Sequence, residues 1–209
     1  MGLVVILVVL HYLAPGHASL FYSQTGIRAG EYWRLITGHL MHADMQHLIW
    51  NCLGLLVLGT LIERFSRLDW WISLLVGIAS VNMLLLSPYA QIDHYIGLSG
   101  VLNTMLVVAL WKEWHQSRSW WVVSIFFTCV AKVVLEVNRG ESVLTNISWP
   151  PYAWAHVAGL LGGIILVCSS ELVGTRIHSG FATVKNVSQK EPIQLEESGS
   201  EPSVNVTFQ

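Results

Sequence analysis

Long apolar runs alternate with short polar segments along the chain, and six such runs lie within its first 172 residues. A membrane-spanning helix needs roughly 20 mostly apolar residues, and most of these runs reach that length once flanking residues are included. The pattern therefore predicts an all-α membrane protein, a bundle of six transmembrane helices. The runs are Gly2–Leu13, His47–Ile62, Trp70–Leu86, Leu98–Trp111, Trp120–Leu135 and Ala153–Leu172.

The segments outside the runs divide the chain further. The first run is short, and we interpret it as a shortened helix rather than a signal-peptide core, because no basic residues precede it. Residues 14–39 mix polar and apolar side chains, which predicts an outer loop with structure of its own. Residues 174–209 are polar and rich in Glu, Ser and Lys, which predicts a disordered tail after a membrane domain of residues 1–173.

The basic residues predict the orientation. Loops that stay in the cytoplasm carry an excess of Lys and Arg, and six spans place both termini on one side. That side holds more basic residues than the other, so we expect cytoplasmic N and C termini. It carries Arg64, Arg67, Lys112, Arg118, Arg176, Lys185 and Lys190, whereas the outer side carries Arg28, Arg34 and Arg139.

Composition agrees with a membrane protein and excludes other classes. Hydrophobic residues make up 53% of the chain and charged residues only 11%, compared with about 25% charged residues in soluble domains. The net charge of -2 gives no sign of a nucleic-acid partner. The three cysteines lie inside apolar runs and are expected to behave as small apolar residues, not as disulfides. No motif typical of a metal or cofactor site is present, so we expect neither.

Three polar signatures interrupt the apolar pattern, each where a run begins. A polar residue inside a membrane span is costly and is by default a candidate functional residue. The second, fourth and sixth spans all enter the membrane from the outer side, so the topology places the three signatures at one depth. They are His47-x-x-x-Asn51, Gly97-Leu98-Ser99-Gly100 and Ala155-His156-x-x-Gly159.

The serine and the last histidine form a candidate catalytic pair. A serine hydroxyl is a weak nucleophile and needs an adjacent base. Ala155, Gly159 and Gly163 recur at four-residue spacing, and such a stripe of small residues lets two membrane helices pack closely. If the fourth and sixth helices meet there, His156 comes within hydrogen-bond reach of Ser99.

His47 and Asn51 are four residues apart and share one helical face. Both side chains donate hydrogen bonds, so they are candidate donors to an oxyanion. No acidic residue is placed near His156 in the sequence, which predicts a Ser–His dyad without a third member. Asn103 lies one turn below Ser99, and we hypothesise that it supports His156.

Each signature alone also fits ordinary helix packing, and the catalytic interpretation depends on their joint occurrence. His39 and His42 are three residues apart, but without a nearby carboxylate or cysteine a metal site is not expected. Lys132 and Glu136 allow two interpretations. In the structural interpretation the two side chains neutralise each other or face the bundle, and in the other they contact substrate.

Together these motifs resemble those of the rhomboid intramembrane serine proteases. The resemblance extends over roughly residues 1–172, and the motifs occur in the family's order on the expected spans. It implies the rhomboid fold and peptide-bond cleavage inside the membrane. The matching residues are Trp33-Arg34 in the outer loop, His42, His47 and Asn51, Gly97-Leu98-Ser99-Gly100, and Ala155-His156-x-x-Gly159.

The resemblance also implies a role for each residue. Ser99 attacks the scissile carbonyl, and His156 acts as general base and then as general acid. His47, Asn51 and the backbone N–H of Ser99 bind the oxyanion, and Arg34 holds the outer loop by bonding nearby backbone. The supporting positions of the predicted site are Gly97, Gly100, Asn103, Gly159, His42 and Arg34.

Within that family the chain looks most like the rhombosortases. The features are the stretches 33–42 and 97–102 and the Lys132…Glu136 pair before the last loop. The likeness implies membrane-anchored protein substrates that end in a Gly-Gly motif, a transmembrane segment and a basic end. It also implies a Gram-negative inner membrane with the active site open to the periplasm. One position departs from the family, because Asn103 stands where many rhomboids carry an aromatic residue.

Three alternatives stay open on the sequence. The chain is a general rhomboid protease of other single-span substrates, a catalytically inactive rhomboid-like binder, or a small transporter or metal or haem protein. The presence of both Ser99 and His156 argues against the inactive binder. The ionisable residues gather at one face instead of crossing the bundle, which argues against transport.

Overall fold

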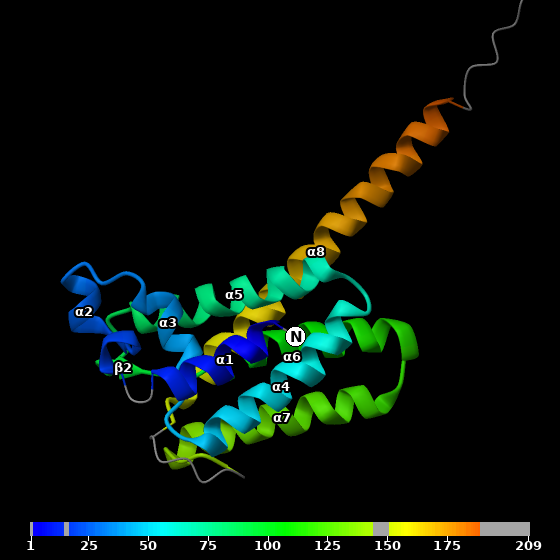
Figure 1. Cartoon of the computed structure of the whole chain (residues 1–209). Coiled ribbons are helices and arrows are strands. Elements are labelled where there is room, and N and C mark those ends of the chain that lie inside the picture. The colour runs from blue at the N-terminus through cyan, green and yellow to red at the C-terminus, as the bar shows by residue number, and fades with distance from the viewer. Residues whose placement is uncertain (1, 15–16, 144–150, 189–209) are drawn as a thin grey trace, which may run out of the picture. The chain divides into compact units, whose positions relative to one another are not determined.

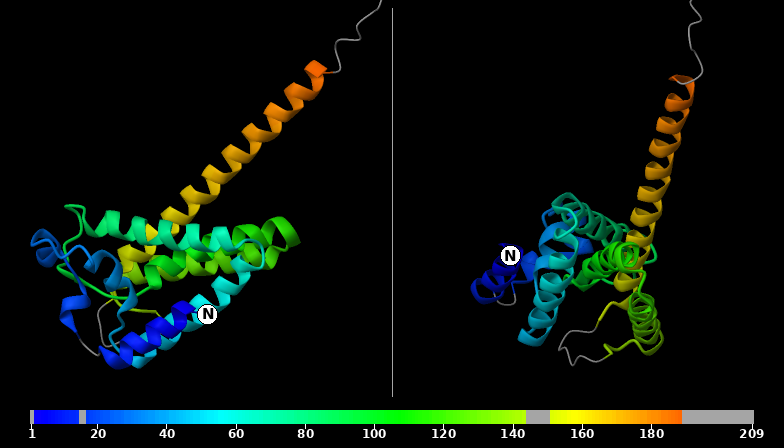
Figure 2. Two further views of the ribbon diagram at one scale, coloured as in Figure 1. Left: turned by 45° about the horizontal axis from the view of Figure 1, so that its top comes forward. Right: turned by 90° about the vertical axis from the view of Figure 1, so that its right-hand side faces the viewer.

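The computed structural model describes residues 2–14, 17–143 and 151–188, with side chains described up to Glu171. Residues up to Ser170 form one unit, and Glu171 begins a second. Figures 1 and 2 show the long helices of the first unit running side by side, with the short helices and strands gathered at one end.

Each of the six apolar runs forms a helix, and its ends follow from local side chains. The Asp44 side chain caps one helix by accepting from the backbone N–H of His47 at 2.7 Å. The Ser66 hydroxyl caps the next by accepting from the backbone N–H of Asp69 at 3.2 Å. Gly140, at a φ of 70°, ends another in the left-handed conformation that glycine adopts at low cost. The long helices are α1 (Gly2–Leu13), α4 (Met45–Glu63), α5 (Arg67–Leu85), α6 (Ser99–Ser117), α7 (Trp120–Arg139) and α8 (Ala153–Ser188).

Four of these helices are long and apolar enough to cross a membrane, namely α4, α5, α7 and the part of α8 from Ala153 to Glu171. Helix α1 is apolar but has only 12 residues. Helix α6 is long enough to cross a membrane but is less apolar on average than these four, and its C-terminal part carries Lys112 and Glu113. The structure thus supports a multi-pass membrane protein, whereas the count of six spans stays a prediction.

Helix α6 lies at the centre of the first unit. It contacts α4, α5 and α7, and its Gly100 meets Gly159 of α8. Nine of its residues are buried, including Val101 and Met105, both with no exposed surface. Its neighbours complete the core with Leu48, Leu55 and Leu160. A helix enclosed by other helices does not touch lipid, so it does not need an apolar outer surface.

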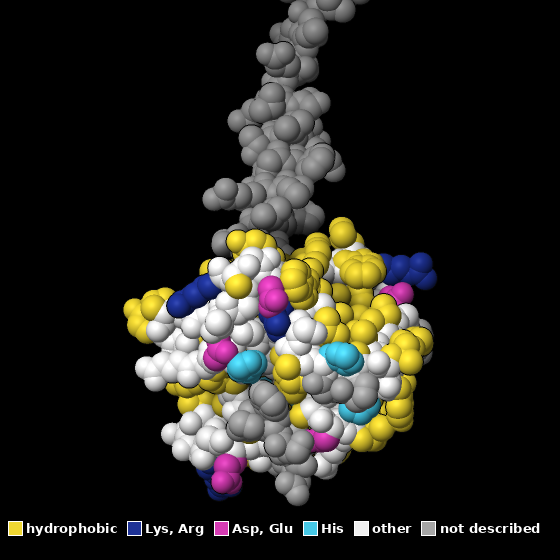
Figure 3. All heavy atoms as spheres, turned by 60° about the vertical axis from the view of Figure 1, so that its left-hand side comes forward, with side chains coloured by type: hydrophobic (Ala, Val, Ile, Leu, Met, Phe, Trp, Pro, Cys, Tyr) yellow, Lys and Arg dark blue, Asp and Glu magenta, His cyan; other side chains and the backbone are white. Residues whose placement is uncertain are grey.

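The outer surface of the bundle is apolar where lipid is expected. Large hydrophobic side chains are exposed on α7, among them Trp120, Trp121 and Phe127. Figure 3 views the end with the short elements, where acidic and histidine side chains lie between wide hydrophobic areas. Exposed apolar area on this scale is typical of a surface that meets membrane.

The predicted outer loop does have structure of its own. It contains η1 (Ala18–Leu20), β1 (Tyr22–Ser23), α2 (Gln24–Arg28) and α3 (Arg34–Leu40), and β1 pairs antiparallel with β2 (His94–Tyr95). Arg34 ties it together, because its guanidinium donates to the carbonyls of Ala18 at 2.6 Å and Phe21 at 2.7 Å and pairs with Glu31 at 2.5 Å. The contacts that the resemblance implies for Arg34 are therefore present.

The tail differs from the prediction. The sequence predicts disorder from residue 174, but α8 continues as a helix to Ser188, so the structure corrects this part of the prediction. No proline occurs between Ala153 and Ser188, and an established helix extends at a lower cost than a new one requires to begin. The remaining residues of the predicted tail, 189–209, lie outside the described residues.

Candidate active site

Ser99 is the first residue of α6, and two residues before it stands a glycine that no other residue can replace without strain. Gly97 has a φ of 115°, a conformation that L side chains rarely adopt. A Cβ at this position would also lie 2.6 Å from ring atoms of His47. The loop before Ser99 therefore runs directly against the His47 imidazole.

The backbones of α6 and α8 touch below Ser99. A Cβ on Gly159 would overlap the carbonyl oxygen of Gly100, and a Cβ on Gly163 would lie 2.7 Å from Cβ of Val107. The hydroxyl of Thr104 donates to the Gly159 carbonyl at 2.7 Å across the same interface. The expected close packing along the small-residue stripe of α8 is confirmed.

This interface brings Ser99 and His156 together. The Ser99 Oγ and the His156 Nε2 are 2.9 Å apart, which is a normal hydrogen bond. His156 lies on the first turn of α8 and is 8% exposed. The two side chains come from positions 57 residues apart in the chain, so only the packing of α6 on α8 places them in contact.

A third residue, which the sequence prediction missed, contacts the same imidazole. The Nδ1 of His156 lies 2.8 Å from Oε2 of Glu136, a side chain with no exposed surface. The expectation that no acidic residue lies near His156 is therefore wrong. Glu136 is on α7, 20 residues before His156, and the rotation of α7 in the bundle cannot be read from adjacent motifs.

The other oxygen of Glu136 is also occupied. Its Oε1 accepts from Nζ of Lys132 at 2.5 Å and from the backbone N–H of Val143 at 3.2 Å. The sequence did contain a signal, because a charged pair inside an apolar run is costly and is by default a candidate functional site. Of the two interpretations of the pair, the one in which it faces the bundle agrees with this geometry.

Asn103 does not support His156 as hypothesised. Its Nδ2 donates to the Ser99 carbonyl at 2.9 Å, one turn back along its own helix. Among the described hydrogen bonds, none joins Asn103 to His156. A short amide side chain at position i+4 reaches its own backbone more readily than a neighbouring helix. Asn103 contributes instead to the wall of the cavity beside Ser99.

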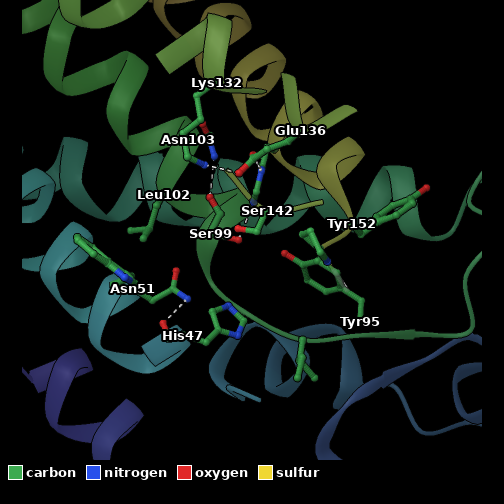
Figure 4. A pocket seen from close by; sticks show the side chains of 14 residues that line it. His47, Asn51, Tyr95, Ser99, Leu102, Asn103, Lys132, Glu136, Ser142 and Tyr152 are labelled. Carbon is green, nitrogen blue, oxygen red and sulfur yellow. Dashed lines mark hydrogen bonds and ion pairs between the residues drawn. The ribbon is translucent and has the colours of Figure 1, made fainter. Parts of the chain in front are cut away.

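His47 and Asn51 face Ser99 across a cavity of about 250 Å³, to which α4, α6, α7 and α8 all contribute (Figure 4). The Nδ2 of Asn51 donates to the His47 carbonyl at 3.0 Å. Because this nitrogen carries two hydrogens, one stays available for a ligand. Within the described part of the chain, the buried Nδ1 of His47 has no partner. The cavity thus holds a hydroxyl, an imidazole and candidate donors on opposite walls.

The rhomboid domain family matches residues 29–169, which include every motif of this cavity. The chain belongs to the rhomboid family. Several relatives with similar sequences are named rhomboid proteases, so membership of this family supports an intramembrane protease.

Two bacterial relatives come from Bacillus subtilis (strain 168). The chain is 31% identical to rhomboid protease GluP over 140 residues, which cover 66% of this chain but 26% of GluP. It thus spans about a quarter of that protein's length. Similarity to the putative rhomboid protease YdcA is 22% identity over 164 residues, 75% of this chain and 79% of YdcA. The Rhomboid-like protein 15 of Arabidopsis thaliana is 26% identical over 147 residues, 63% of this chain and 35% of that protein.

Two further histidines of this rhomboid chain lie behind the cavity. The ring of His42 packs edge-on against His47 with centroids 4.9 Å apart, and burial, followed by the charge of His47, lowers the pKa of His42 to about 3. His39 bonds Asn82 at 3.1 Å, and burial lowers its pKa to about 4. Both rings are therefore neutral near pH 7. Within the described ranges, no three His, Cys, Asp or Glu side chains gather as metal ligands.

Proposed function

We propose that this chain is an intramembrane serine endopeptidase in which Ser99 is the nucleophile and His156 the general base. The observation that carries the proposal is the 2.9 Å hydrogen bond between Ser99 Oγ and His156 Nε2 at the cavity. A nucleophile within hydrogen-bond reach of a base is the arrangement that activates a weak hydroxyl. Membership of the rhomboid family gives independent support.

The proposed reaction has two stages. Ser99 Oγ attacks the scissile carbonyl while its proton moves to Nε2 of His156, which then gives that proton to the leaving amine. The resulting acyl-enzyme is an ester on Ser99. A water molecule, deprotonated by the same Nε2, attacks the ester; the ester bond breaks, the carboxylic acid is released, and Nε2 returns the proton to Ser99 Oγ. The chemistry needs no cofactor.

We further propose that His47, Asn51 and the backbone N–H of Ser99 bind the oxyanion formed during attack. The two side chains lie on the opposite wall of the cavity from Ser99 (Figure 4). A donor aimed at a developing oxyanion typically contributes about 3–4 kcal/mol to catalysis.

For the membrane arrangement, we propose that α1 and α6 span the bilayer along with the four apolar helices. Both termini then lie in the cytoplasm and the cavity opens to the periplasm of a Gram-negative inner membrane. The distribution of Lys and Arg between the loops supports this orientation.

The proposed substrates are membrane-anchored proteins that end in a Gly-Gly motif, a transmembrane segment and a basic end. A transmembrane helix satisfies its own backbone hydrogen bonds, so it must unwind before a carbonyl can be attacked. Glycine is about 1 kcal/mol less favourable than alanine in a helix, which makes a Gly-Gly step easy to unwind. Glycine also puts no side chain against the bulky Tyr95 and Tyr152 that line the cavity.

The test is cleavage of a tagged Gly-Gly substrate in membranes by the wild-type chain, Ser99→Ala and His156→Ala. Ser124→Ala and His115→Ala are matched controls, because both side chains are exposed and bond only their own helix in the described contacts. We expect cleavage by the wild type and both controls and none by the two site variants. Equal cleavage by all five would show that the activity comes from a contaminant.

The substrate proposal and the reaction proposal fail separately. Cleavage of other single-span proteins without cleavage of the Gly-Gly substrate would contradict the rhombosortase assignment and leave a general rhomboid protease. Capture of single-span proteins that are never cleaved would contradict the protease and favour a rhomboid-like binder.

A further inference from the structure

Glu136 is the fully buried acidic side chain of the described structure, and it lies inside an apolar helix. Burying a charge without partners is very unfavourable, so buried carboxylates are paired and hydrogen-bonded. Glu136 meets this condition with three donors from three places, which are Lys132, Val143 and His156. An ion pair with Lys132 alone would not require the carboxylate to point at the imidazole.

The two carboxylate oxygens divide these partners. Oε1 receives both the Lys132 ammonium at 2.5 Å and the Val143 N–H at 3.2 Å. Oε2 receives the Nδ1 of His156 at 2.8 Å. Lys132 and Val143 therefore fix the rotamer of Glu136 without competing for the oxygen that faces the imidazole.

This contact decides which histidine nitrogen carries the proton. A carboxylate only accepts hydrogen bonds, so Nδ1 of His156 must be the protonated nitrogen. Nε2 is then a bare acceptor, which is the form that takes the Ser99 proton at 2.9 Å. Without a partner on Nδ1, the imidazole is free to place its proton on Nε2, where it would block attack.

We propose that Glu136 is the positioning residue of a Ser99–His156–Glu136 triad, and that Lys132 is the counter-charge that holds the carboxylate in place. Glu136 fixes the His156 tautomer and stabilises the imidazolium that forms when Ser99 attacks. The inference rests on the proposed function, since a positioning residue needs a reaction to act on. It gives the Lys132–Glu136 pair a catalytic purpose beyond the neutralisation of charge inside a membrane.

The first measurement is kinetic and uses the full chain in lipid nanodiscs with a substrate that the wild type cleaves. We expect Glu136→Gln to lower kcat by about 100-fold or more with KM little changed, because the amide keeps the shape but loses the charge. Glu136→Asp keeps the charge and should recover part of kcat. Lys132→Met should lower kcat less than Glu136→Gln does. Lys132→Arg keeps the positive charge and should have a kcat close to that of the wild type.

Glu113→Gln is the matched control. This carboxylate pairs with Arg64 near the other end of α6, so the substitution breaks an ion pair far from Ser99. We expect its kcat to equal that of the wild type. A general loss of folding from replacing a paired glutamate would lower both variants, whereas the proposed role lowers only Glu136→Gln.

The second measurement does not depend on turnover. In the wild type with ¹⁵N-labelled histidine, NMR should show the His156 proton on Nδ1, strongly downfield because it lies in a hydrogen bond to a carboxylate. In Glu136→Gln that resonance should move upfield or vanish. A wild-type His156 that carries its proton on Nε2 would overturn the inference even if Glu136→Gln failed to fold.

The outcomes separate the inference from the proposed function. If the wild type cleaves, Ser99→Ala does not, and Glu136→Gln retains wild-type kcat, the triad is wrong and the serine protease stands. If the wild type neither cleaves a substrate nor reacts with a fluorophosphonate at Ser99, both the proposed protease activity and the proposed triad are wrong.

Discussion

Helices α6 and α7 are neighbours of similar length, with 19 and 20 residues, but the protein uses them differently. Helix α6 buries nine residues between α4, α5, α7 and α8. Helix α7 buries three, which are Val122, Val133 and Glu136, and exposes six large apolar side chains, among them Trp120, Trp121 and Phe127. The buried residues of α6 are nearly all apolar or small, whereas one of the three on α7 is a carboxylate.

The comparison shows two ways to place a residue at a site. Ser99 is placed by shape, because α6 and α8 approach until their glycine backbones touch and no other spacing fits. Glu136 is placed by polar bonds, since α7 has little apolar packing to fix its rotation. Substitutions that change shape should therefore act mainly through α6, and those that remove polar partners mainly through α7.

The largest expected effect on stability comes from breaking the shape of the α6–α8 contact. In Gly159→Ala the new methyl group overlaps the Gly100 carbonyl oxygen, a backbone atom that cannot move aside. We expect a loss of about 3 kcal/mol in the free energy of unfolding and loss of cleavage, because α8 must shift and carry His156 away from Ser99. Reversible unfolding in mixed detergent micelles measures the first quantity.

Gly54→Ala on α4 is the matched control for that substitution. Its Cβ would meet only the tip of the Leu102 side chain, at 2.9 Å, which can rotate away. A loss as large as that of Gly159→Ala would show that any added methyl group in a membrane helix has this effect, and would contradict the role given to the glycine contact.

An effect of intermediate size on the free energy of unfolding should distinguish the packing of α6 from that of α7. Met105→Ala on α6 removes a side chain with no exposed surface and leaves a cavity, which we expect to lower the free energy of unfolding by about 2 kcal/mol. Phe127→Ala on α7 removes a larger side chain that is 63% exposed, and we expect a change within about 0.5 kcal/mol. Equal losses in the same unfolding assay would mean that α7 is packed as tightly as α6.

The smallest effect compares two threonine hydrogen bonds. Thr104→Val removes the bond from α6 to the Gly159 carbonyl of α8 at 2.7 Å, and we expect a loss of about 0.6 kcal/mol, the average for an interhelical bond in a membrane. Thr128→Val on α7 removes a bond to the Ser124 carbonyl of the same helix at 2.8 Å. This variant should unfold like the wild type, and the reverse order would contradict the comparison.

Much of the fold was predictable because it follows from local properties. All six apolar runs became helices, since a long apolar segment in lipid must satisfy its backbone bonds within itself. Their boundaries moved by a few residues at some ends, as where the run Leu98–Trp111 became α6, Ser99–Ser117. The helical continuation of α8 to Ser188 was not predicted, because polar composition alone does not distinguish a solvated helix from a coil.

The position of Glu136 was harder to predict, although its helix holds a polar series at four-residue spacing. Ser124, Thr128, Lys132 and Glu136 form this series, but each step of four residues turns about 40° around a helix with 3.6 residues per turn. Its two ends therefore face in different directions, and in the structure Ser124 and Thr128 are exposed while Glu136 is buried. The series alone does not say which end faces the bundle.

By itself the sequence determined the helices, the stripe of small residues on α8, and Ser99 and His156 as a candidate catalytic pair. Those features follow from side-chain size and polarity at fixed spacings within one helix. Only the tertiary structure decided that Glu136 reaches His156 and that Asn103 bonds the Ser99 carbonyl instead. Both depend on how far one helix is rotated against another, and that rotation is set by packing and polar partners from several segments at once.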